Sequence, residues 1–163
     1  MDSGKAFHSL ASGIDYPMFI VTTMAGTEPS GCLVGFVTQG SINPIRLVVM
    51  LSKSNHTYRV ALRASQLVVH FLHRGNLELS ELFGEETGDQ TDKFARCRWH
   101  HVDGVAPPVL LGTRGWAAGP VLSRFDAGDH MGHVVDVTAA AVDSDGPQLG
   151  FQMVNTMQPG HPA

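Results

Sequence analysis

Cysteine is scarce in this sequence, with only Cys32 and Cys97 among 163 residues. The two lie far apart and outside any Cys-x-x-Cys spacing, which indicates neither a structural zinc site nor a disulfide framework. His130 and His133 lack a third nearby ligand candidate, so we expect no metal site. A chain without a disulfide framework is typical of a reducing compartment, so we predict a cytoplasmic protein.

Positive charge and long apolar runs are also lacking. Eleven Lys and Arg residues stand against fifteen Asp and Glu, a formal net charge of −4. No long-range positive field exists to gather nucleic acid or anionic lipid, so we expect neither as a partner. No stretch of ~18 apolar residues occurs and the N-terminus carries no signal-peptide core, which predicts no membrane span.

Several catalytic signatures are absent. The chain contains no Gly-x-Ser-x-Gly elbow, no Gly-x-x-x-x-Gly-Lys-Ser/Thr loop and no Gly-x-Gly-x-x-Gly turn. Cys32 falls in a predicted buried strand, where a thiol stays protonated and inert. These absences argue against a hydrolase, a P-loop enzyme and a Rossmann dinucleotide site.

Glycine and proline, by contrast, are plentiful, with 18 and 9 residues and no fixed period. That composition favours a turn-rich fold dominated by strands over a helical bundle. The length fits one domain over residues 1–163, with a core at about 15–155 and a mobile tail at 156–163. The spacing of short strands favours an antiparallel barrel, closed or partly closed, with helices packed against it.

Hydrophobic periodicity gives the expected elements. Phe7, Leu10, Ala11 and Ile14 form an amphipathic stripe that predicts a packing helix. The apolar run 47–51 resembles a strand buried on both faces, and 127–129 suits a hairpin turn. We expect strands at about 16–25, 30–42, 46–52, 67–72, 116–126, 130–142 and 149–154, and short helical segments after 54, near 79–83 and over 91–97.

Two neighbouring segments have the composition of a nucleotide site. Residues 52–57 combine three hydroxyls, an amide and Lys53 just before a predicted helix, which suits a phosphate; an ordinary helix cap with a solvated lysine is the alternative. Residues 30–35 offer little side-chain bulk, so their backbone could meet a flat ring; barrel curvature would also explain the glycines. His130, at a hairpin tip, could line a pocket mouth. Before Trp99, a helical turn could close a pocket, with Lys93 as its cation and Phe94 as an apolar wall. The alternative is a core Phe94 beside an exposed Lys93 that forms a salt bridge.

The order of these pieces resembles the flavin reductase-like family of FMN-binding split barrels, over about residues 15–142. The resemblance rests on Thr22-Thr23, Glu28-Pro29-Ser30-Gly31, the segment 37–44, Leu51-Ser52-Lys53-Ser54-Asn55-His56-Thr57, Val69-His70-Phe71-Leu72, Asp92-Lys93-Phe94 and Gly128-Asp129-His130. It implies an antiparallel split β-barrel of Greek-key type with a few short flanking helices. It also implies FMN, with FAD as an alternative, and NADH or NADPH as co-substrate.

The resemblance implies roles for particular residues. Flavin contacts fall on Ser30, Gly31, Cys32, Leu33, Val34, Gly35, Ser52, Lys53, Ser54, Asn55, Thr57, Lys93 and Phe94, and nicotinamide placement falls on His130. The implied activity is hydride transfer from NAD(P)H to flavin in a homodimer, with a monooxygenase as a partner. Leu33-Val34-Gly35-Phe36 stands where family members often carry hydroxyls, so backbone N–H groups must replace those contacts. Two other functions are possible from the sequence. One is a flavin- or haem-binding carrier without turnover, and the other is a partner-binding barrel without a cofactor.

Overall fold

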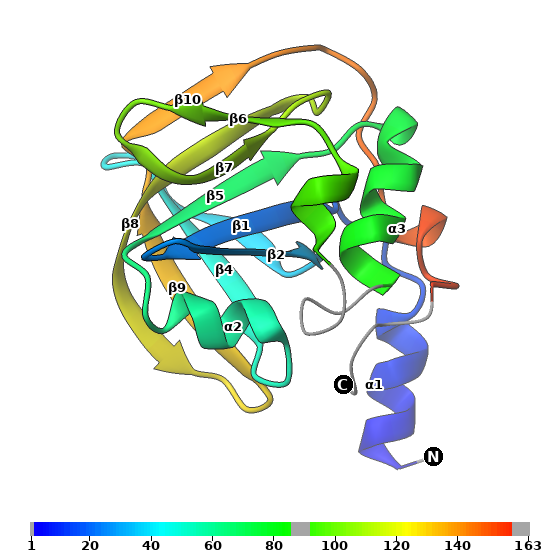
Figure 1. Ribbon diagram of the computed structural model, residues 1–163. Helices are drawn as coiled ribbons and strands as arrows, with labels where there is room; N and C mark the ends of the chain where they lie inside the picture. Colours follow the sequence, from blue (N-terminus) through cyan, green and yellow to red (C-terminus); the bar gives the residue numbers. More distant parts are fainter. Residues whose placement is uncertain (1, 86–91, 158–163) are drawn as a thin grey trace.

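A curled antiparallel sheet forms the body of the protein in the computed structural model, which describes residues 2–85 and 92–157 (Figure 1). The main sheet has eight strands in the order β2-β1-β5-β8-β9-β4-β3, with β10 also paired to β8. Its strands are β1 (Phe19–Ala25), β2 (Glu28–Val34), β3 (Val37–Ser41), β4 (Arg46–Ser52), β5 (Gln66–Phe71), β8 (Gly115–Asp126), β9 (His130–Asp136) and β10 (Ala139–Val142). The expected antiparallel split barrel is confirmed.

The split in the barrel lies between two strands that are consecutive in the chain. Strands β2 and β3 stand at opposite ends of the strand order, so the single strand expected over 30–42 is wrong. The chain leaves the sheet at Gly35 and Phe36, where a Cβ on Gly35 would come within 2.7 Å of the Tyr16 ring. The Met50 N–H donates to the Phe36 carbonyl at 2.9 Å, which fixes this link beside β4.

The strand expected over 130–142 is also two strands, because the chain changes partners on β8. Strand β9 pairs with the second half of β8, whereas β10 pairs with its first half. The connecting backbone passes so close to Gly119 that a Cβ there would lie 1.6 Å from the Asp136 carbonyl oxygen. The hairpin turn expected at 127–129 joins β8 and β9 as predicted.

Buried clusters lie on both faces of the sheet: Val69 and Ala117 belong to one cluster, and their chain neighbours Val68 and Ala118 belong to another that includes β7 (Val105–Leu110). Strand β4 contributes Leu47, Val49 and Leu51, each at most 8% exposed, while the residues between them are only half-buried. The expectation that 47–51 is buried on both faces is therefore wrong, because the other face of β4 is only partly covered. A further strand, β6 (Trp99–Val102), forms a separate hairpin with β7. The imidazole of His70 joins β7 to the main sheet: its Nδ1 donates to the Ile20 carbonyl at 2.8 Å, and its Nε2 accepts from the Leu110 N–H at 2.9 Å.

Short helices pack near the site. Helix α2 (His56–Ala61) begins where expected, and the side chain of its N-cap Asn55 accepts from the Thr57 N–H at 2.8 Å. Helix α3 (Leu77–Glu85) packs beside β2 and buries Phe83. The 3-10 turns are η1 (Arg74–Asn76), η2 (Lys93–Arg96) and η3 (Phe151–Met153).

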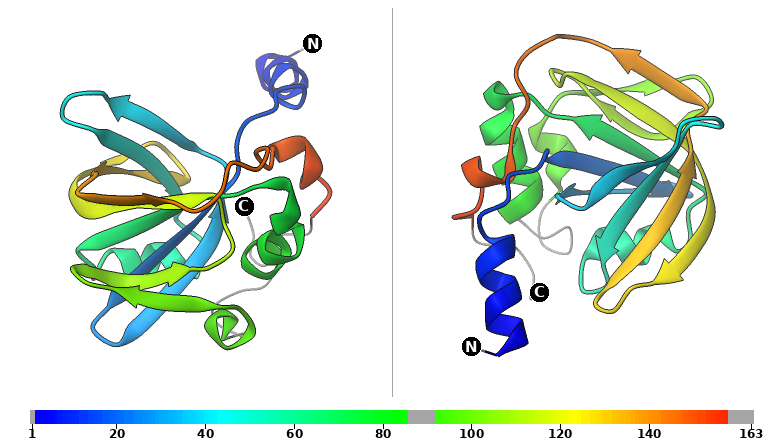
Figure 2. Two further views of the ribbon diagram at one scale, coloured as in Figure 1. Left: turned by 90° about the horizontal axis from the view of Figure 1, so that it is seen from above. Right: turned by 180° about the vertical axis from the view of Figure 1, so that it is seen from behind.

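The two ends of the described chain differ from expectation. Helix α1 (Ser3–Ala11) extends away from the sheet and buries no residue (Figure 2). Phe7 is 71% exposed and Leu10 is 73% exposed. The expectation that this helix packs against the rest of its own chain is therefore wrong for the described residues. Segment 149–154 is not a strand, because after one bridge between Pro17 and Gly150 it turns into η3. Most of the expected tail, 158–163, lies outside the described residues, and within 2–85 and 92–157 no helix is long and apolar enough to cross a membrane.

Candidate nucleotide-binding site

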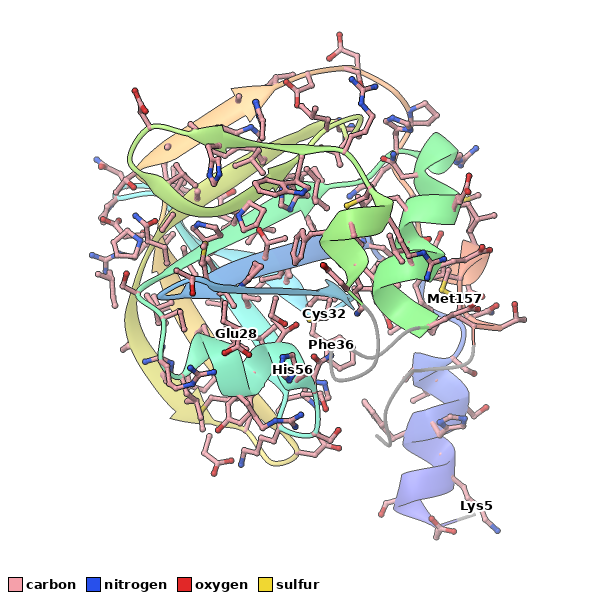
Figure 3. The ribbon with its side chains drawn as sticks, viewed as in Figure 1. Lys5, Glu28, Cys32, Phe36, His56 and Met157 are labelled. Atoms are coloured by element: carbon pink, nitrogen blue, oxygen red, sulfur yellow. The ribbon has the colours of Figure 1, made fainter. Side chains whose placement is uncertain are left out.

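A cavity of about 200 Å³ opens at the split of the barrel. The end of β2 and the link that leaves it form one wall, which includes Cys32 and Phe36 (both labelled in Figure 3). The end of β4 and the start of β9 form another wall. Its lining residues are Tyr16, Met18, Cys32, Leu33, Val34, Gly35, Phe36, Met50, Ser52, Asn55, His130 and Phe151. Seven of the fourteen residues predicted from the sequence therefore line one cavity: Cys32, Leu33, Val34, Gly35, Ser52, Asn55 and His130.

Strand pairing explains why distant motifs meet there. In the ladder between β4 and β9, Ser52 stands directly opposite His130. The Lys53 N–H then donates to the Asp129 carbonyl at 2.9 Å, which fastens the loop 52–55 to the β8–β9 hairpin. On the other side, the hydroxyls of Ser30 and Thr57 share a buried hydrogen bond of 2.8 Å. That bond ties β2 to helix α2, so the hydroxyl-rich loop and the glycine-containing strand share one side of the molecule.

The loop 52–55 gathers polar groups. The Ser52 and Ser54 hydroxyl oxygens are 3.0 Å apart, and the Lys53 ammonium lies 2.8 Å from an Asp126 carboxylate oxygen. The hydrogen bond from Lys53 holds the pKa of Asp126 below its usual range. The loop therefore does provide the helix cap, through Asn55, but its lysine is in an ion pair rather than simply solvated. Two hydroxyls and an ammonium form a donor set that suits a phosphate monoester.

The opposite wall is apolar and unreactive. Cys32 is 3% exposed, and burial raises the pKa of its thiol to about 11, although hydrogen bonds with Thr57 and Asn55 oppose the shift. At neutral pH the thiol is protonated and does not act as a nucleophile. With Leu33 and Val34 beside it, this wall suits an apolar ring.

His130 is held at the cavity by its neighbour. Its Nδ1 lies 2.7 Å from Asp129 Oδ1, and this hydrogen bond lowers the pKa of Asp129. The ring of His130 also stands 5.3 Å from that of Phe36. An imidazole fixed in this way has a defined orientation at the mouth of the cavity.

The other seven predicted residues lie outside the cavity lining: Ser30, Gly31, Lys53, Ser54, Thr57, Lys93 and Phe94. Lys93 is 5% exposed and its ammonium donates to the carbonyls of Gly31 (3.3 Å) and Phe83 (3.1 Å). The alternative of an exposed lysine is therefore wrong. Phe94 packs edge-on against Phe83, with ring centroids 5.6 Å apart, and so belongs to the cluster under α3.

Gly31 also has a packing reason. A Cβ at this position would lie 2.8 Å from the Phe83 ring, just as one at Gly35 would meet Tyr16. Both glycines thus make room for aromatic rings of the chain itself. Neither glycine has a positive φ angle.

Five lining residues escaped the sequence reasoning: Tyr16, Met18, Phe36, Met50 and Phe151. Tyr16 and Phe151 stack with centroids 4.7 Å apart although they are distant in the chain. No local pattern could have paired them. Of these five, only Phe36 could have been noticed in the sequence, because it ends the apolar stretch 33–36 that stands where family members often carry hydroxyls.

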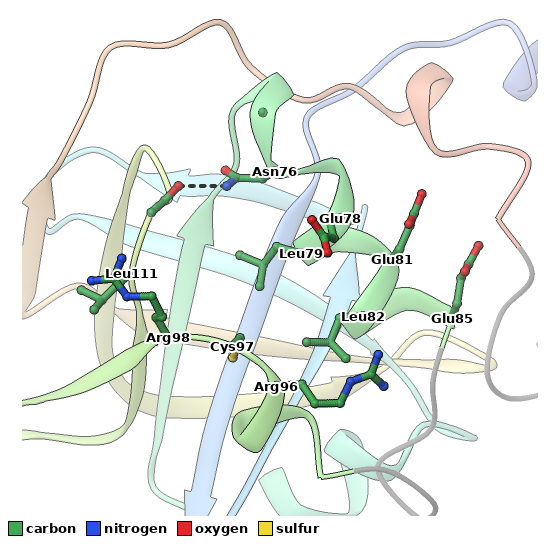
Figure 4. Close-up of a pocket in the computed structure, with 12 residues that line it drawn as sticks. Asn76, Glu78, Leu79, Glu81, Leu82, Glu85, Arg96, Cys97, Arg98 and Leu111 are labelled. Carbon is green, nitrogen blue, oxygen red and sulfur yellow. Dashed lines mark hydrogen bonds between the residues drawn. The ribbon is translucent and has the colours of Figure 1, made fainter.

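A larger cavity of about 840 Å³ lies elsewhere, between α3 and the segments around 97 and 111 (Figure 4). Glutamates of α3 line one side, and Arg96 and Arg98 line the other. None of the fourteen predicted residues lines it. The smaller cavity is the better candidate site because Ser52 and Asn55 of the polar loop, the fixed imidazole and the apolar wall meet there. Over the part of the chain that the structure describes, no group of three His, Cys, Asp or Glu residues could hold a metal ion.

The sequence as a whole places this site in a known family. Residues 11–157 match the family model described as "Flavin reductase like domain". The chain belongs to the flavin reductase-like family.

Individual relatives are distant and often longer. High molecular weight rubredoxin of Moorella thermoacetica is 27% identical over 157 residues, which cover 96% of this chain and 67% of that protein. The reductase component of a flavin-dependent trigonelline monooxygenase from Acinetobacter baylyi is 24% identical, covering 86% of this chain and 46% of that protein. A protein named probable flavin reductase from Rhizobium meliloti is 26% identical over 82% of this chain and 41% of its own length. The chain thus spans less than half of the last two.

Solved structures of low identity share the fold. The flavin reductase domain protein from Arthrobacter sp. FB24 superposes with a TM-score of 0.83 at 21% identity, covering 98% of this chain and 96% of that chain. The NADH:FAD oxidoreductase SgcE6 of Streptomyces globisporus gives 0.81 at 17% identity, covering 91% of this chain and 86% of that chain.

Proposed function

We propose that this protein is a flavin reductase that transfers hydride from NADH or NADPH to FMN, with FAD as an alternative acceptor. The observation that carries the proposal is the meeting of the apolar link 32–35 with the polar loop 52–55 at one cavity, beside His130. When bound, the flavin ring supplies the hydride acceptor, so the protein needs to position two ligands and exclude water rather than provide a nucleophile. Membership of the flavin reductase-like family supports this reading.

Each wall of the cavity has a proposed role. The Ser52 and Ser54 hydroxyls and the Lys53 ammonium hold the flavin phosphate, with Asn55 and Thr57 fixing the loop around it. The backbone of 30–35 faces the ring and the ribityl chain. Lys93 and Phe94 act from behind this strand, where Lys93 holds the Gly31 carbonyl and Phe94 packs on Phe83.

His130 positions the nicotinamide. Its hydrogen bond to Asp129 fixes the ring at the mouth of the cavity, where a second planar ligand would approach the flavin. No proton has to move through the imidazole in a hydride transfer, so its part is orientation.

The quaternary and metabolic setting follows from the same proposal. We infer a cytoplasmic homodimer of 1–163, each chain a single domain, that supplies reduced flavin to a monooxygenase. Two relatives support the last point by name, the trigonelline monooxygenase reductase component and the stachydrine N-demethylase reductase subunit Stc3 of Rhizobium meliloti.

An anaerobic reduction assay tests the activity. The purified protein is mixed with FMN and NADH or NADPH, and absorbance is followed at about 450 nm, where oxidised flavin absorbs. We expect the band to bleach much faster than in protein-free controls. Flavin binding without bleaching would identify a carrier, and the absence of both would refute the proposal. Each nucleotide is tested separately.

A further inference from the structure

A row of four aromatic rings borders the mouth of the cavity. Phe151 stacks on Tyr16 (centroids 4.7 Å apart, planes at 11°), Tyr16 is 6.0 Å from Phe36, and Phe36 is 5.3 Å from His130. The four come from separate segments, yet all line the cavity. We call them the aromatic row.

The row is held in place by backbone contacts. The Phe151 N–H donates to the Tyr16 carbonyl at 2.8 Å, and Met50 donates to the Phe36 carbonyl. Gly35 leaves the space that the Tyr16 ring occupies. Rings fixed in this way form a stacking surface that exists before a ligand arrives, which limits the entropy lost on binding.

Phe36 differs from the rest of the row in its exposure. Its side chain is 54% exposed, whereas Tyr16 and Phe151 are half-buried. Single exposed apolar residues are common, but this one stands between two other rings at a cavity mouth. An aromatic face presented to solvent there offers a partner for another planar group.

The size of the cavity indicates which group that is. Its volume of about 200 Å³ is less than the roughly 300–1,000 Å³ of pockets that enclose one drug-sized ligand, so a flavin bound there extends to the mouth and a dinucleotide lies outside. Nicotinamide has to reach the flavin ring for hydride transfer. The adenine of the dinucleotide is the planar group that remains outside, and stacking on an aromatic side chain needs no charged partner.

We propose that Phe36 stacks against the adenine of the dinucleotide co-substrate and so determines the preference for a dinucleotide over a mononucleotide. The inference rests on the proposed function, since it assumes that flavin occupies the cavity and nicotinamide its mouth.

The test is a binding comparison that needs no turnover. Isothermal titration of the FMN-loaded protein with NAD⁺ and with nicotinamide mononucleotide gives two dissociation constants. We expect the wild type to bind NAD⁺ more tightly, and Phe36→Ala to lose roughly 5- to 100-fold for NAD⁺ with little change for the mononucleotide. Phe36→Tyr keeps a ring and retains the preference, whereas Phe36→Leu keeps apolar bulk without a π face and loses it.

Each other result overturns the proposal in a distinct way. An equal loss for both nucleotides puts Phe36 against nicotinamide, and weakened FMN binding in Phe36→Ala puts it against the flavin. Unchanged constants remove Phe36 from recognition. If the wild type binds neither nucleotide and does not bleach FMN, the proposed function fails together with this inference; if the wild type bleaches FMN and Phe36→Ala keeps its preference for NAD⁺, only the inference fails.

Discussion

Lys53 belongs to the loop that we assign to the flavin phosphate, and it also contacts two aspartates of the β8–β9 hairpin. Its ammonium is 2.8 Å from Asp126, and its N–H donates to the Asp129 carbonyl. A bound phosphate would therefore share this lysine with Asp126. The competition at one side chain sets how tightly the phosphate is held.

Removing the ammonium weakens binding of the phosphate alone. We expect Lys53→Ala to raise the dissociation constant of FMN roughly tenfold, the size of a charged hydrogen bond that is partly exposed to solvent. Riboflavin, which lacks the phosphate, serves as the matched ligand and should bind equally to both proteins. Fluorescence titration of each flavin measures the constants, and an equal loss for both would refute the assignment.

Removing the Asp126 carboxylate, which competes with the phosphate for Lys53, should strengthen FMN binding. Asp126→Asn leaves Lys53 without its close anionic partner, so FMN should bind a few-fold more tightly, more so at low salt because exposed charges are screened. The same fluorescence titration, repeated at low and high ionic strength, checks it. Weaker binding of FMN in this variant would mean that Asp126 positions the loop rather than competing with the ligand.

At the scale of elements, His70 joins three strands through its two ring nitrogens. Burial lowers the pKa of this imidazole to about 4, although the hydrogen bond that the ring donates to the Ile20 carbonyl opposes the shift. In the unfolded chain the pKa is about 6.5, so between these values the unfolded state binds a proton that the folded state does not. The contribution to stability is complete above pH 6.5 and decreases as the pH falls towards 4.

That difference predicts an acid-sensitive fold. We expect the free energy of unfolding to fall by on the order of 3 kcal/mol between pH 6.5 and pH 4 through this one group. His70→Gln can also donate and accept but does not titrate, so its stability should change less with pH. Urea unfolding at several pH values compares the two, and parallel pH profiles would contradict this role of His70.

Strand β8 depends on a glycine where the chain crosses it. A Cβ at Gly119 would lie 1.6 Å from a backbone carbonyl oxygen, whereas one at Gly40 would mainly meet the end of the Val48 side chain at 2.9 Å. Backbone cannot yield as a side chain can. We expect Gly119→Ala to destabilise the protein by about 3 kcal/mol or more and Gly40→Ala by much less, as measured by chemical unfolding. Equal costs would mean that the crossing relaxes easily.

Local chemistry predicted local elements well. The Asn55 cap, the turn at 127–129 and the strand 46–52 were all evident because their signals lie within a few residues. The breaks between β2 and β3 and between β9 and β10 were not, because strand pairing decides where they fall. The stripe of α1 shows the same limit: periodicity reports an apolar face but not what covers it.

For the site, the sequence indicated the two walls of the cavity but not the aromatic residues at its mouth. The loop 52–55 and the link 32–35 were recognisable from hydroxyls, glycines and the family resemblance. Tyr16 and Phe151 meet only because the C-terminal segment returns to the start of β1. Lys93 was predicted as a residue of the site, but its burial behind β2 depends on packing against Phe83.

At the scale of the whole molecule, the barrel stays open where β2 and β3 part, and the cavity lies in that opening. The half-barrel brings the ends of β2, β4 and β9 together, so residues far apart in the sequence form one surface. The larger cavity beside α3 offers more space but none of the predicted residues. We therefore assign flavin to the smaller cavity.

The most direct measurement of that claim is a crystal structure of the protein with FMN. We expect the phosphate within hydrogen-bonding distance of the Ser52 and Ser54 hydroxyls, and the flavin ring against the backbone of 32–35. A flavin bound between α3 and Arg98, or a phosphate remote from loop 52–55, would contradict it.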